Sequence, residues 1–352
     1  MLWGLLGALV FYAATLVTAH RKQQCITSMH IEIADSTETR RLTSSARILS
    51  WIDRSNIAVK GENIDSVNIG AIEHAIERNS FIEKADIYVT HSGRLNISVK
   101  QRKPVVRLMT EGYNSYITSD GVIFRAPKGS ALYVPVITGN YRPVIPSDFE
   151  GEMATYIVEQ LEQYAKQIKS IEEDIAVLNK ERSRYTAMRR PPQRRADEGF
   201  FAHLARKKAW RKDWKENKQK IRRYSIGMER DVDLRRSKVE QRLAAVRNEQ
   251  KKFEKRYADF RNLITFVEKL SNDSYWSAEV VQFVAHNTPD LEPDIELIPR
   301  SGSFNILLGR LDDTEQKLDK LASFLEKGLG RMGWDRYKTL DIRYNKQVVC
   351  TE

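Results

Sequence analysis

The pattern in this sequence that most resembles a cofactor-binding motif is a group of glycines near the C-terminus. Gly328, Gly330 and Gly333 have the spacing Gly-x-Gly-x-x-Gly of a dinucleotide-binding turn. That turn must follow a strand and open a helix, because the helix N-terminus has to face the pyrophosphate. Here a predicted helix precedes the glycines and a predicted strand follows them. The pattern therefore indicates the end of a helix and not a nucleotide site.

Histidines and cysteines give no sign of a metal site or a nucleophile. The histidines are dispersed, at positions 20, 30, 74, 91, 203 and 286, and none has metal-ligand spacing to a cysteine. The sequence contains no P-loop, no Gly-x-Ser-x-Gly and no His-Glu-x-x-His. Cys25 and Cys350 leave open whether the chain carries a disulfide bond. We therefore predict a protein that is not an enzyme and has no cofactor.

Charge is the strongest compositional signal. The chain has 352 residues, with 58 Lys and Arg against 47 Asp and Glu, a net charge of +11. Residues 160–262 hold 30 basic and 16 acidic residues, so the rest of the chain, with 28 and 31, is mildly acidic. A hydrophobic fraction of 41% can build cores in two or three domains and argues against wholesale disorder. The basic excess belongs to one segment.

The N-terminus predicts a transmembrane anchor over residues 1–22. Residues 2–19 are uncharged and are followed at once by His20, Arg21 and Lys22. As a helix this stretch spans roughly 27 Å, just enough for a hydrocarbon core. A cleaved signal peptide is the alternative, but no basic region precedes the apolar stretch, which is long for such a peptide. The flanking charges leave the orientation open.

Residues 25–102 are predicted to form one small domain. Residues 29–34 alternate in polarity like a strand, and residues 43–54 and 69–78 have the apolar spacing of short amphipathic helices. Two further alternating strands, 85–90 and 95–99, are joined by a short polar turn with a glycine. The order is strand-helix-helix-strand-strand.

The next predicted domain is split in the sequence, into residues 103–150 and 263–352. Short strands are expected at 105–109, 116–118, 122–124 and 134–137, and again at 278–285, 295–298 and 304–308. A helix over 314–329 precedes two final strands, 338–344 and 347–351. The fold class is therefore α+β.

Residues 151–262 have the clearest periodicity and interrupt the β domain. Apolar residues recur with alternating spacings of four and three, from Ile157 to Tyr185 and from Val239 to Val267. This spacing predicts an antiparallel helical coiled-coil hairpin, with arms of roughly 50 to 60 Å, although two helices lying flat on the β domain are the alternative. The chain is expected to reverse between Pro191 and Gly227.

The tip of this hairpin carries a concentrated positive charge. Residues 189–223 hold 14 basic and 4 acidic residues, interleaved with aromatic ones. This composition suits membrane headgroups or an acidic polymer, and a merely solvated helix surface is the competing interpretation. Nucleic acid would require the segment to lie in the cytoplasm, and we do not expect it as a partner. The candidate tip residues are Arg194, Arg195, Lys207, Lys208, Trp210, Arg211 and Trp214.

Several motifs in a fixed order carry a family resemblance. Residues 93–105 read Gly-Arg-Leu-Asn-Ile-Ser-Val-Lys-Gln-Arg-Lys-Pro-Val, residues 116–121 read Tyr-Ile-Thr-Ser-Asp-Gly, and residues 134–139 read Val-Pro-Val-Ile-Thr-Gly. Further pieces follow at 266–276, at 297–302 and in Leu-Asp-Ile-Arg-Tyr at 340–344. Together they resemble the extracytoplasmic part of the FtsQ/DivIB family of bacterial cell-division proteins, in the form seen among Bacteroidota.

The resemblance implies a single-pass inner-membrane protein whose bulk lies in the periplasm at the division septum. It implies a POTRA domain for the strand-helix-helix-strand-strand region, followed by the β domain. The inserted hairpin lies outside the common family pattern. FtsQ-like proteins are non-enzymatic scaffolds that link early divisome components to septal wall synthesis.

The resemblance also implies where partners bind. FtsB- and FtsL-like partners are expected to add a strand to the C-terminal edge, which by motif falls on Arg343, Tyr344, Lys346 and Val348. The alternative for Tyr344 is that it packs on the sheet. A rival function is a membrane-anchored periplasmic adaptor of the membrane-fusion type, which also has a hairpin within a β domain. That class needs lipoyl-like halves beside the hairpin, and the sequence shows none.

Overall fold

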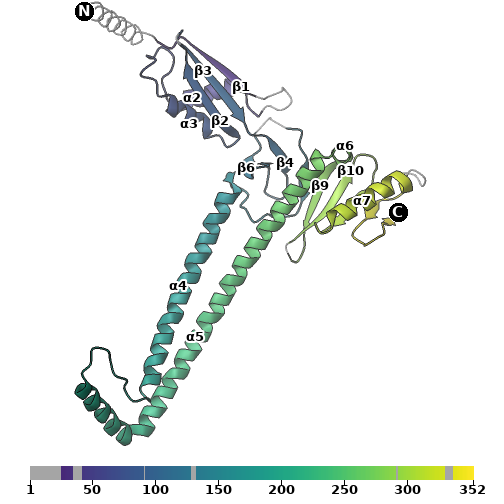
Figure 1. The fold of residues 1–352 in the computed structure, drawn as a ribbon. Coiled ribbons are helices and arrows are strands. Elements are labelled where there is room, and N and C mark those ends of the chain that lie inside the picture. Colours follow the sequence, from purple (N-terminus) through teal and green to yellow (C-terminus); the bar gives the residue numbers. More distant parts are fainter. Residues whose placement is uncertain (1–24, 35–41, 91, 128–131, 291, 330–335) are drawn as a thin grey trace, which may run out of the picture. The chain divides into compact units, whose positions relative to one another are not determined.

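A computed structural model describes residues 25–34, 42–90, 92–127, 132–290, 292–329 and 336–352 (Figure 1). The predicted anchor, residues 1–22, lies outside the described residues. Among the described helices, none is both long and apolar enough to cross a membrane. Contacts divide the chain into two compact units: one joins the part up to Ala154 with Arg256–Glu352, and the other is Thr155–Lys255.

The first unit begins with the predicted strand-helix-helix-strand-strand order, which the structure confirms. Its elements are β1 (Ser28–Ala34), α2 (Ser45–Arg54), α3 (Ile69–Glu77), β2 (Ile82–Val89) and β3 (Arg94–Gln101). In this sheet β3 is central, parallel to β1 and antiparallel to β2. Both helices begin at side-chain caps, in which Ser44 accepts from the amide of Arg47 and Asn68 from that of Ala71. The alternating apolar residues of the strands and helices meet in one buried core.

The rest of the first unit is built on a sheet of ten described strands in the order β13-β12-β11-β10-β9-β7-β4-β5-β6-β8. The strands before the hairpin are β4 (Pro104–Leu108), β5 (Ser115–Thr118), β6 (Val122–Arg125), β7 (Val136–Gly139) and β8 (Gly151–Glu152). Those after it are β9 (Val280–Asn287), β10 (Pro293–Pro299), β11 (Asn305–Gly309), β12 (Thr339–Asp341) and β13 (Val349–Thr351).

One parallel pairing joins the two halves of this sheet. Strand β7 pairs with β9 from Val136 opposite Gln282 to Gly139 opposite Ala285. Gly139 has a φ of +103°, and a Cβ there would lie 2.2 Å from the carbonyl oxygen of Ala285. Only glycine allows this close approach without a shift of the backbone. Strands from both sides of the inserted helices therefore share one sheet.

Several predicted elements of this region differ in detail. The strand predicted from residue 278 is preceded by a short helix, α6 (Ser274–Glu279), because Asp273 accepts hydrogen bonds from the amides of Tyr275 and Trp276. The helix predicted over 314–329 is α7 (Thr314–Phe324) followed by a π-helical turn (Leu325–Leu329). Gly328 lies in that turn, whereas Gly330 and Gly333 lie outside the described residues.

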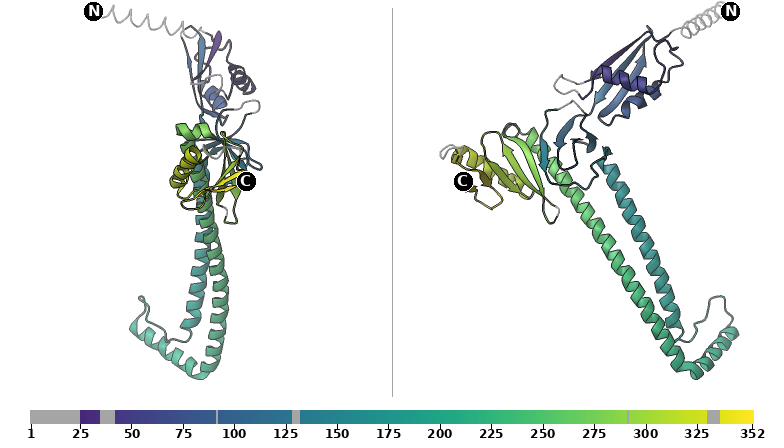
Figure 2. Two further views of the ribbon diagram at one scale, coloured as in Figure 1. Left: turned by 90° about the vertical axis from the view of Figure 1, so that its right-hand side faces the viewer. Right: turned by 180° about the vertical axis from the view of Figure 1, so that it is seen from behind.

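The inserted segment forms a helical hairpin (Figures 1 and 2). Helix α4 (Met153–Ala187) and helix α5 (Phe200–Asn272) are joined by residues 188–199. Helix α5 contains one kink, at Asn217, where φ is −117° and ψ is 15°. The prediction that Gly227 helps to reverse the chain is wrong, because α5 runs through it. A helical glycine costs only about 1 kcal/mol, which packing between the arms can offset.

The arms of the hairpin run antiparallel. Ion pairs cross between them: Glu172 with Arg247, Glu181 with Arg235, Arg182 with Asp233 and, just after the end of α4, Arg189 with Glu229. As the residue numbers increase on the first arm, those of the partners on α5 decrease. The rings of Tyr164 and Phe253 are 5.8 Å apart in the same seam. The predicted apolar positions are less exposed than their neighbours, and Val232 continues the series as a buried residue. Supercoiling of the arms stays a prediction.

Candidate partner-binding edge and hairpin tip

The strand β12 next to the sheet edge shows which of its backbone groups face inward. The amide of Asn305 donates to the carbonyl oxygen of Lys338 at 2.9 Å, and the amide of Ile342 donates to that of Leu307 at 3.1 Å. Both bonds join residues that flank β12 (Thr339–Asp341) to its inner neighbour, β11, whereas the amide of Lys338 donates to Thr351 of β13 at 2.8 Å. Because alternate residues of a strand turn their backbone groups to opposite sides, those of Leu340 also face β11.

The last strand, β13, therefore has a defined open side. Thr339 and Asp341 turn their backbone groups toward β13, where their partners are Thr351 and Val349. Cys350 lies between these two partners, so its N–H and C=O point away from β12. Among the described strands β13 pairs only with β12. Its outward backbone groups are the kind that a strand from another chain can bind.

The four residues predicted to form the edge strand do not belong to β13. They lie on the connection between β12 and β13. The predicted strands 338–344 and 347–351 are too long, because β12 ends at Asp341 and β13 begins at Val349. Arg343, Tyr344, Lys346 and Val348 therefore belong to a loop. Lys346 has a φ of +60°, which belongs to a turn and not to a strand.

Helix α7 accounts for the early end of β12. The ammonium group of Lys320 donates to the carbonyl oxygen of Ile342 at 2.8 Å and also to that of Tyr344. These two carbonyls are bound by a side chain instead of a neighbouring strand. Burial, together with the nearby charge of Lys317, lowers the pKa of Lys320. The loop 342–348 is thus held from one side by a half-buried cation.

A second polar contact fixes the start of the loop. The carboxylate of Asp341 accepts hydrogen bonds from Nε of Arg343 at 2.9 Å, from its Nη2 at 2.6 Å and from its backbone amide at 3.0 Å. These bonds hold the pKa of Asp341 below its ordinary value despite partial burial. Gly309, with a φ of +77°, leaves room for the stem of Arg343, since a Cβ there would lie 2.7 Å from its Cγ.

The exposed side chains of this edge are partly apolar. Tyr344 is 50% exposed and Val349 is 40% exposed. Arg343 and Lys346 are also exposed, whereas Val348 is half-buried. Tyr344 therefore offers half of its surface to solvent. We call residues 342–351, which include Tyr344, Val349 and Cys350, the C-terminal edge.

The sequence reasoning missed Lys320, Asp341 and Cys350 at this edge. Cys350 could have been found from the alternation of the last strand, had its bounds been predicted correctly. Both cysteines have free thiols, and burial raises the pKa of Cys350. Lys320 gives no local signal, because its partners lie more than twenty positions away in the chain.

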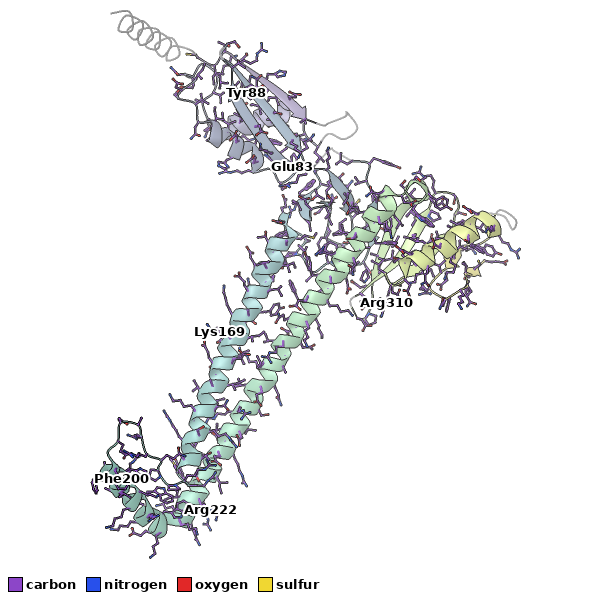
Figure 3. All side chains as sticks on the ribbon, in the orientation of Figure 1. Glu83, Tyr88, Lys169, Phe200, Arg222 and Arg310 are labelled. Carbon is purple, nitrogen blue, oxygen red and sulfur yellow. The ribbon has the colours of Figure 1, made fainter. Side chains whose placement is uncertain are left out.

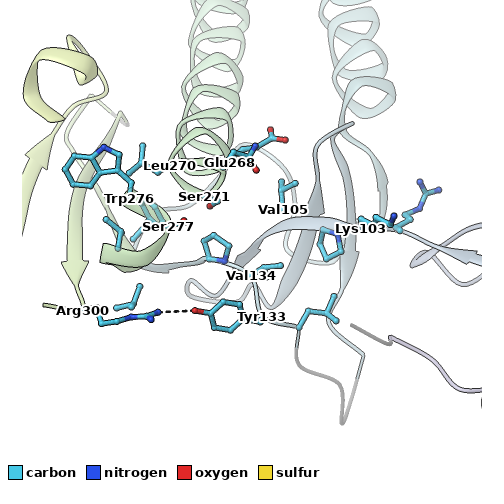
Figure 4. Close-up of a pocket in the computed structure, with 18 of the residues that line it drawn as sticks. Lys103, Val105, Tyr133, Val134, Glu268, Leu270, Ser271, Trp276, Ser277 and Arg300 are labelled. Atoms are coloured by element: carbon cyan, nitrogen blue, oxygen red, sulfur yellow. Dashed lines mark hydrogen bonds between the residues drawn. The ribbon is translucent and has the colours of Figure 1, made fainter. Parts of the chain in front are cut away.

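A cavity of about 510 Å³ lies elsewhere in the same unit (Figure 4). Its walls combine apolar side chains, Trp276 and Val134 among them, with a hydrogen bond that Arg300 Nη2 donates to the hydroxyl of Tyr133 at 3.0 Å. In the described part of the chain, no three His, Cys, Asp or Glu side chains are grouped as metal ligands would be. The lining residues form no recognisable catalytic set.

The predicted tip residues come from two adjacent segments (Figure 3). Arg194 and Arg195 lie on the connection 188–199, and the other five lie on the first part of α5. The indole rings of Trp210 and Trp214 are stacked 5.5 Å apart and are half-buried. The exposed aromatic residues of the tip are Phe200 and Phe201, which are absent from the predicted set.

Ion pairs hold the tip together on the inside. Glu229 accepts from Arg189 Nη2 at 2.6 and 2.8 Å and from the Thr186 hydroxyl at 2.8 Å. Burial would raise the pKa of Glu229, but these hydrogen bonds outweigh it and keep the pKa below its ordinary value. Arg206 donates to the carbonyl oxygen of Gln193 at 2.7 Å and pairs with Glu198.

Comparison with known families gives two matches. A family model described as a POTRA-like domain matches residues 23–100, and one described as FtsQ/DivIB, C-terminal related, matches residues 230–351. The second match begins within α5, so part of the inserted hairpin lies inside the matched range. Neither match is to a membrane-fusion adaptor.

No curated protein matches the chain. The two family matches occur in the order that the fold displays, with the strand-helix-helix-strand-strand region first and the C-terminal edge in the second range. Residues 23–100 are thus similar to POTRA-like domains and residues 230–351 to the C-terminal region of FtsQ/DivIB-related proteins, and the two matches together support a protein of the FtsQ/DivIB family of cell-division proteins.

Proposed function

We propose that this chain is a non-enzymatic divisome scaffold that binds FtsB- and FtsL-like partners at its C-terminal edge. In this role it links early division proteins to septal wall synthesis. The single observation that carries the proposal is the open side of β13, which lies within the residues matched by the FtsQ/DivIB model. A partner strand can bond to the outward backbone groups of Cys350, while Tyr344 and Val349 supply apolar contact.

The proposal includes a location. The uncharged stretch of residues 2–19 anchors the chain in the inner membrane by a single pass, and the bulk of the chain lies in the periplasm at the division septum. The support for this location is the uncharged stretch itself, which as a helix spans roughly the thickness of a hydrocarbon core. A reporter fused after Glu352 tests it, since periplasmic activity is expected and cytoplasmic activity contradicts it.

A pull-down with the FtsB-like partner tests the partner site. Replacing Tyr344 by Arg places a charge where apolar contact is proposed, and we expect binding to fall at least about tenfold. Because half of Tyr344 is exposed, the variant should fold normally. Tyr88→Arg is the matched control, since Tyr88 is 58% exposed on β2, in the other sheet.

The two variants together make the result decisive. Loss of binding in Tyr344→Arg with binding intact in Tyr88→Arg supports the C-terminal edge. Equal binding by Tyr344→Arg and the parent chain would contradict the assignment of Tyr344 to the partner site. Circular dichroism of both variants shows whether the fold is retained.

A further inference from the structure

The first part of α5 has a half-buried face and, about 110° around the helix axis from it, an exposed face at the hairpin tip. His203, Lys207, Trp210 and Trp214 recur at spacings of four, three and four and are half-buried. The other face consists of residues spaced by three and four, all of which are exposed: Phe201, Leu204, Lys208, Arg211 and Lys215. Such spacing puts each set on one side of a helix. We call the exposed set, together with Phe200, the outer face of the tip.

Within the described part of the chain, the basic residues of the outer face have no acidic partner in an ion pair. Lys208, Arg211 and Lys215 form no ion pair with any described residue, whereas Arg189 and Arg206 on the inside pair with glutamates. With 14 basic and 4 acidic residues, the segment 189–223 cannot neutralise itself. Its free charge is available to an anionic surface.

The outer face also exposes large apolar side chains beside these charges. Phe200 is 56% exposed, Phe201 84% and Leu204 45%. A helix that is only solvated gains nothing from such exposure. Basic residues flanked by exposed Phe and Leu are the pattern of helices that lie at the boundary between lipid headgroups and acyl chains.

The connection below this face is already ordered by hydrogen bonds. Arg206 binds the carbonyl oxygen of Gln193, and Nε of Arg194 donates to that of Glu198 at 3.1 Å. The stacked Trp210 and Trp214 support the helix from the inner side. Docking therefore requires little ordering of the tip, which lowers the free-energy cost of binding.

We propose that the outer face of the tip docks onto a bilayer surface that carries anionic phospholipids. Charge alone would suit a soluble acidic polymer equally well, but such a polymer does not use the exposed Phe200, Phe201 and Leu204. Anionic lipid headgroups can form ion pairs with the basic residues, and the apolar side chains can be buried at the boundary with the acyl chains. The proposal concerns a surface other than the C-terminal edge, so it does not depend on the proposed function.

Vesicle capture by the full chain tests this docking. The chain is held in phosphatidylcholine nanodiscs by its own N-terminal segment, immobilised by a C-terminal tag, and exposed to vesicles of phosphatidylcholine with or without phosphatidylglycerol. We expect at least about tenfold tighter binding of the anionic vesicles. Because each basic residue near an anionic surface contributes about fivefold, reversing Lys208, Arg211 and Lys215 to Glu should weaken binding by about 100-fold or more.

Two further variants separate lipid docking from simple charge attraction. Phe200→Ser with Phe201→Ser keeps the charge and retains residues that suit a helix start, and should weaken vesicle binding at least about tenfold. The matched charge control reverses Lys169, Lys180 and Lys238, exposed residues on the arms, and should change binding by less than about threefold.

Each alternative outcome overturns the proposal. Equal binding of anionic and neutral vesicles excludes recognition of anionic lipid. Full binding by the Phe200→Ser, Phe201→Ser variant, with displacement by polyphosphate at the same phosphate concentration, assigns the tip to a soluble acidic polymer instead. If the arm control loses as much vesicle binding as the variant with Lys208, Arg211 and Lys215 reversed, net charge, and not the outer face, attracts the vesicles.

Discussion

At the C-terminal edge, one carboxylate fixes the position of the loop that carries Tyr344. Asp341 accepts three hydrogen bonds from Arg343, and its side chain is only 11% exposed, so the pair is partly shielded from solvent. Hydrogen bonds to a charged group are worth about 1.5 to 3 kcal/mol when solvent screening is reduced. Because the side chain of Arg343 is 46% exposed, screening by solvent reduces the free energy that its hydrogen bonds with Asp341 contribute.

Replacing Asp341 by Asn should therefore destabilise the chain in a pH-dependent way. The folded-state pKa of Asp341 is below its unfolded value, so its contribution is present above the unfolded pKa of about 3.9 and is lost as the pH falls through the folded pKa. We expect the variant to lose about 2 kcal/mol of unfolding free energy at pH 7 and much less near pH 2. Urea unfolding at both pH values measures this.

An exposed aspartate supplies the control for that measurement. Asp290 pairs with Arg310 at 3.0 Å, but its side chain is 66% exposed. Because exposed ion pairs contribute little, Asp290→Asn should cost less than about 1 kcal/mol at either pH. A loss for Asp341→Asn that is the same at pH 7 and pH 2 would show that the charge of Asp341 does not stabilise the edge.

Among the elements, helix α7 acts as a support for the loop 342–348. Lys320, on α7, donates hydrogen bonds to two alternate carbonyl oxygens of the chain after β12, those of Ile342 and Tyr344. The helix is itself fixed by Lys317, which donates to the carbonyl oxygen of Arg310 at 2.8 Å and pairs with Asp312. The helix thereby holds in place a segment that lies outside the strands of the sheet and is bonded to β11 through the amide of Ile342.

Lys320→Met should loosen this loop while leaving the helix intact. Methionine has a similar length and good helix propensity but no donor, so the two carbonyls lose their partner. We expect amide hydrogen exchange over residues 342–348 to accelerate at least about tenfold. The exposed Lys327→Met is the control and should leave exchange unchanged. Unaltered exchange in Lys320→Met would contradict the supporting role of α7.

Across the whole molecule, local patterns predicted the elements far better than their pairing. The alternation of residues 29–34 and the caps at Ser44 and Asn68 are local signals, and the corresponding elements were predicted within a few residues. The heptad spacing likewise predicted two antiparallel arms. The pairing of Val136 with Gln282 could not be predicted, since no short-range pattern relates residues so far apart in the chain.

The errors at the C-terminal edge have the same physical origin. The run of residues 338–344 reads as a strand because its alternation is intact, but Lys320 binds the carbonyls that a longer strand would offer to a neighbour. At the tip, the composition marked Phe200, Phe201, Trp210 and Trp214 alike, but only the two Trp residues entered the candidate set, whereas the folded tip half-buries these and exposes Phe200 and Phe201. Tertiary contacts decided both cases.

In the proposed complex a partner adds a strand to the outward backbone groups of Cys350. The most direct measurement is the affinity of the FtsB-like partner for Cys350→Pro, with Cys350→Ala as the matched control. Proline removes the outward N–H, and it is tolerated in an edge strand when that group faces away from the sheet. Both variants remove the thiol, so only the backbone donor distinguishes them.

We expect Cys350→Pro to bind the partner at least about tenfold more weakly than Cys350→Ala, while both variants unfold at closely similar urea concentrations. Equal affinities of the two variants, with the fold intact in each, would contradict strand addition at β13.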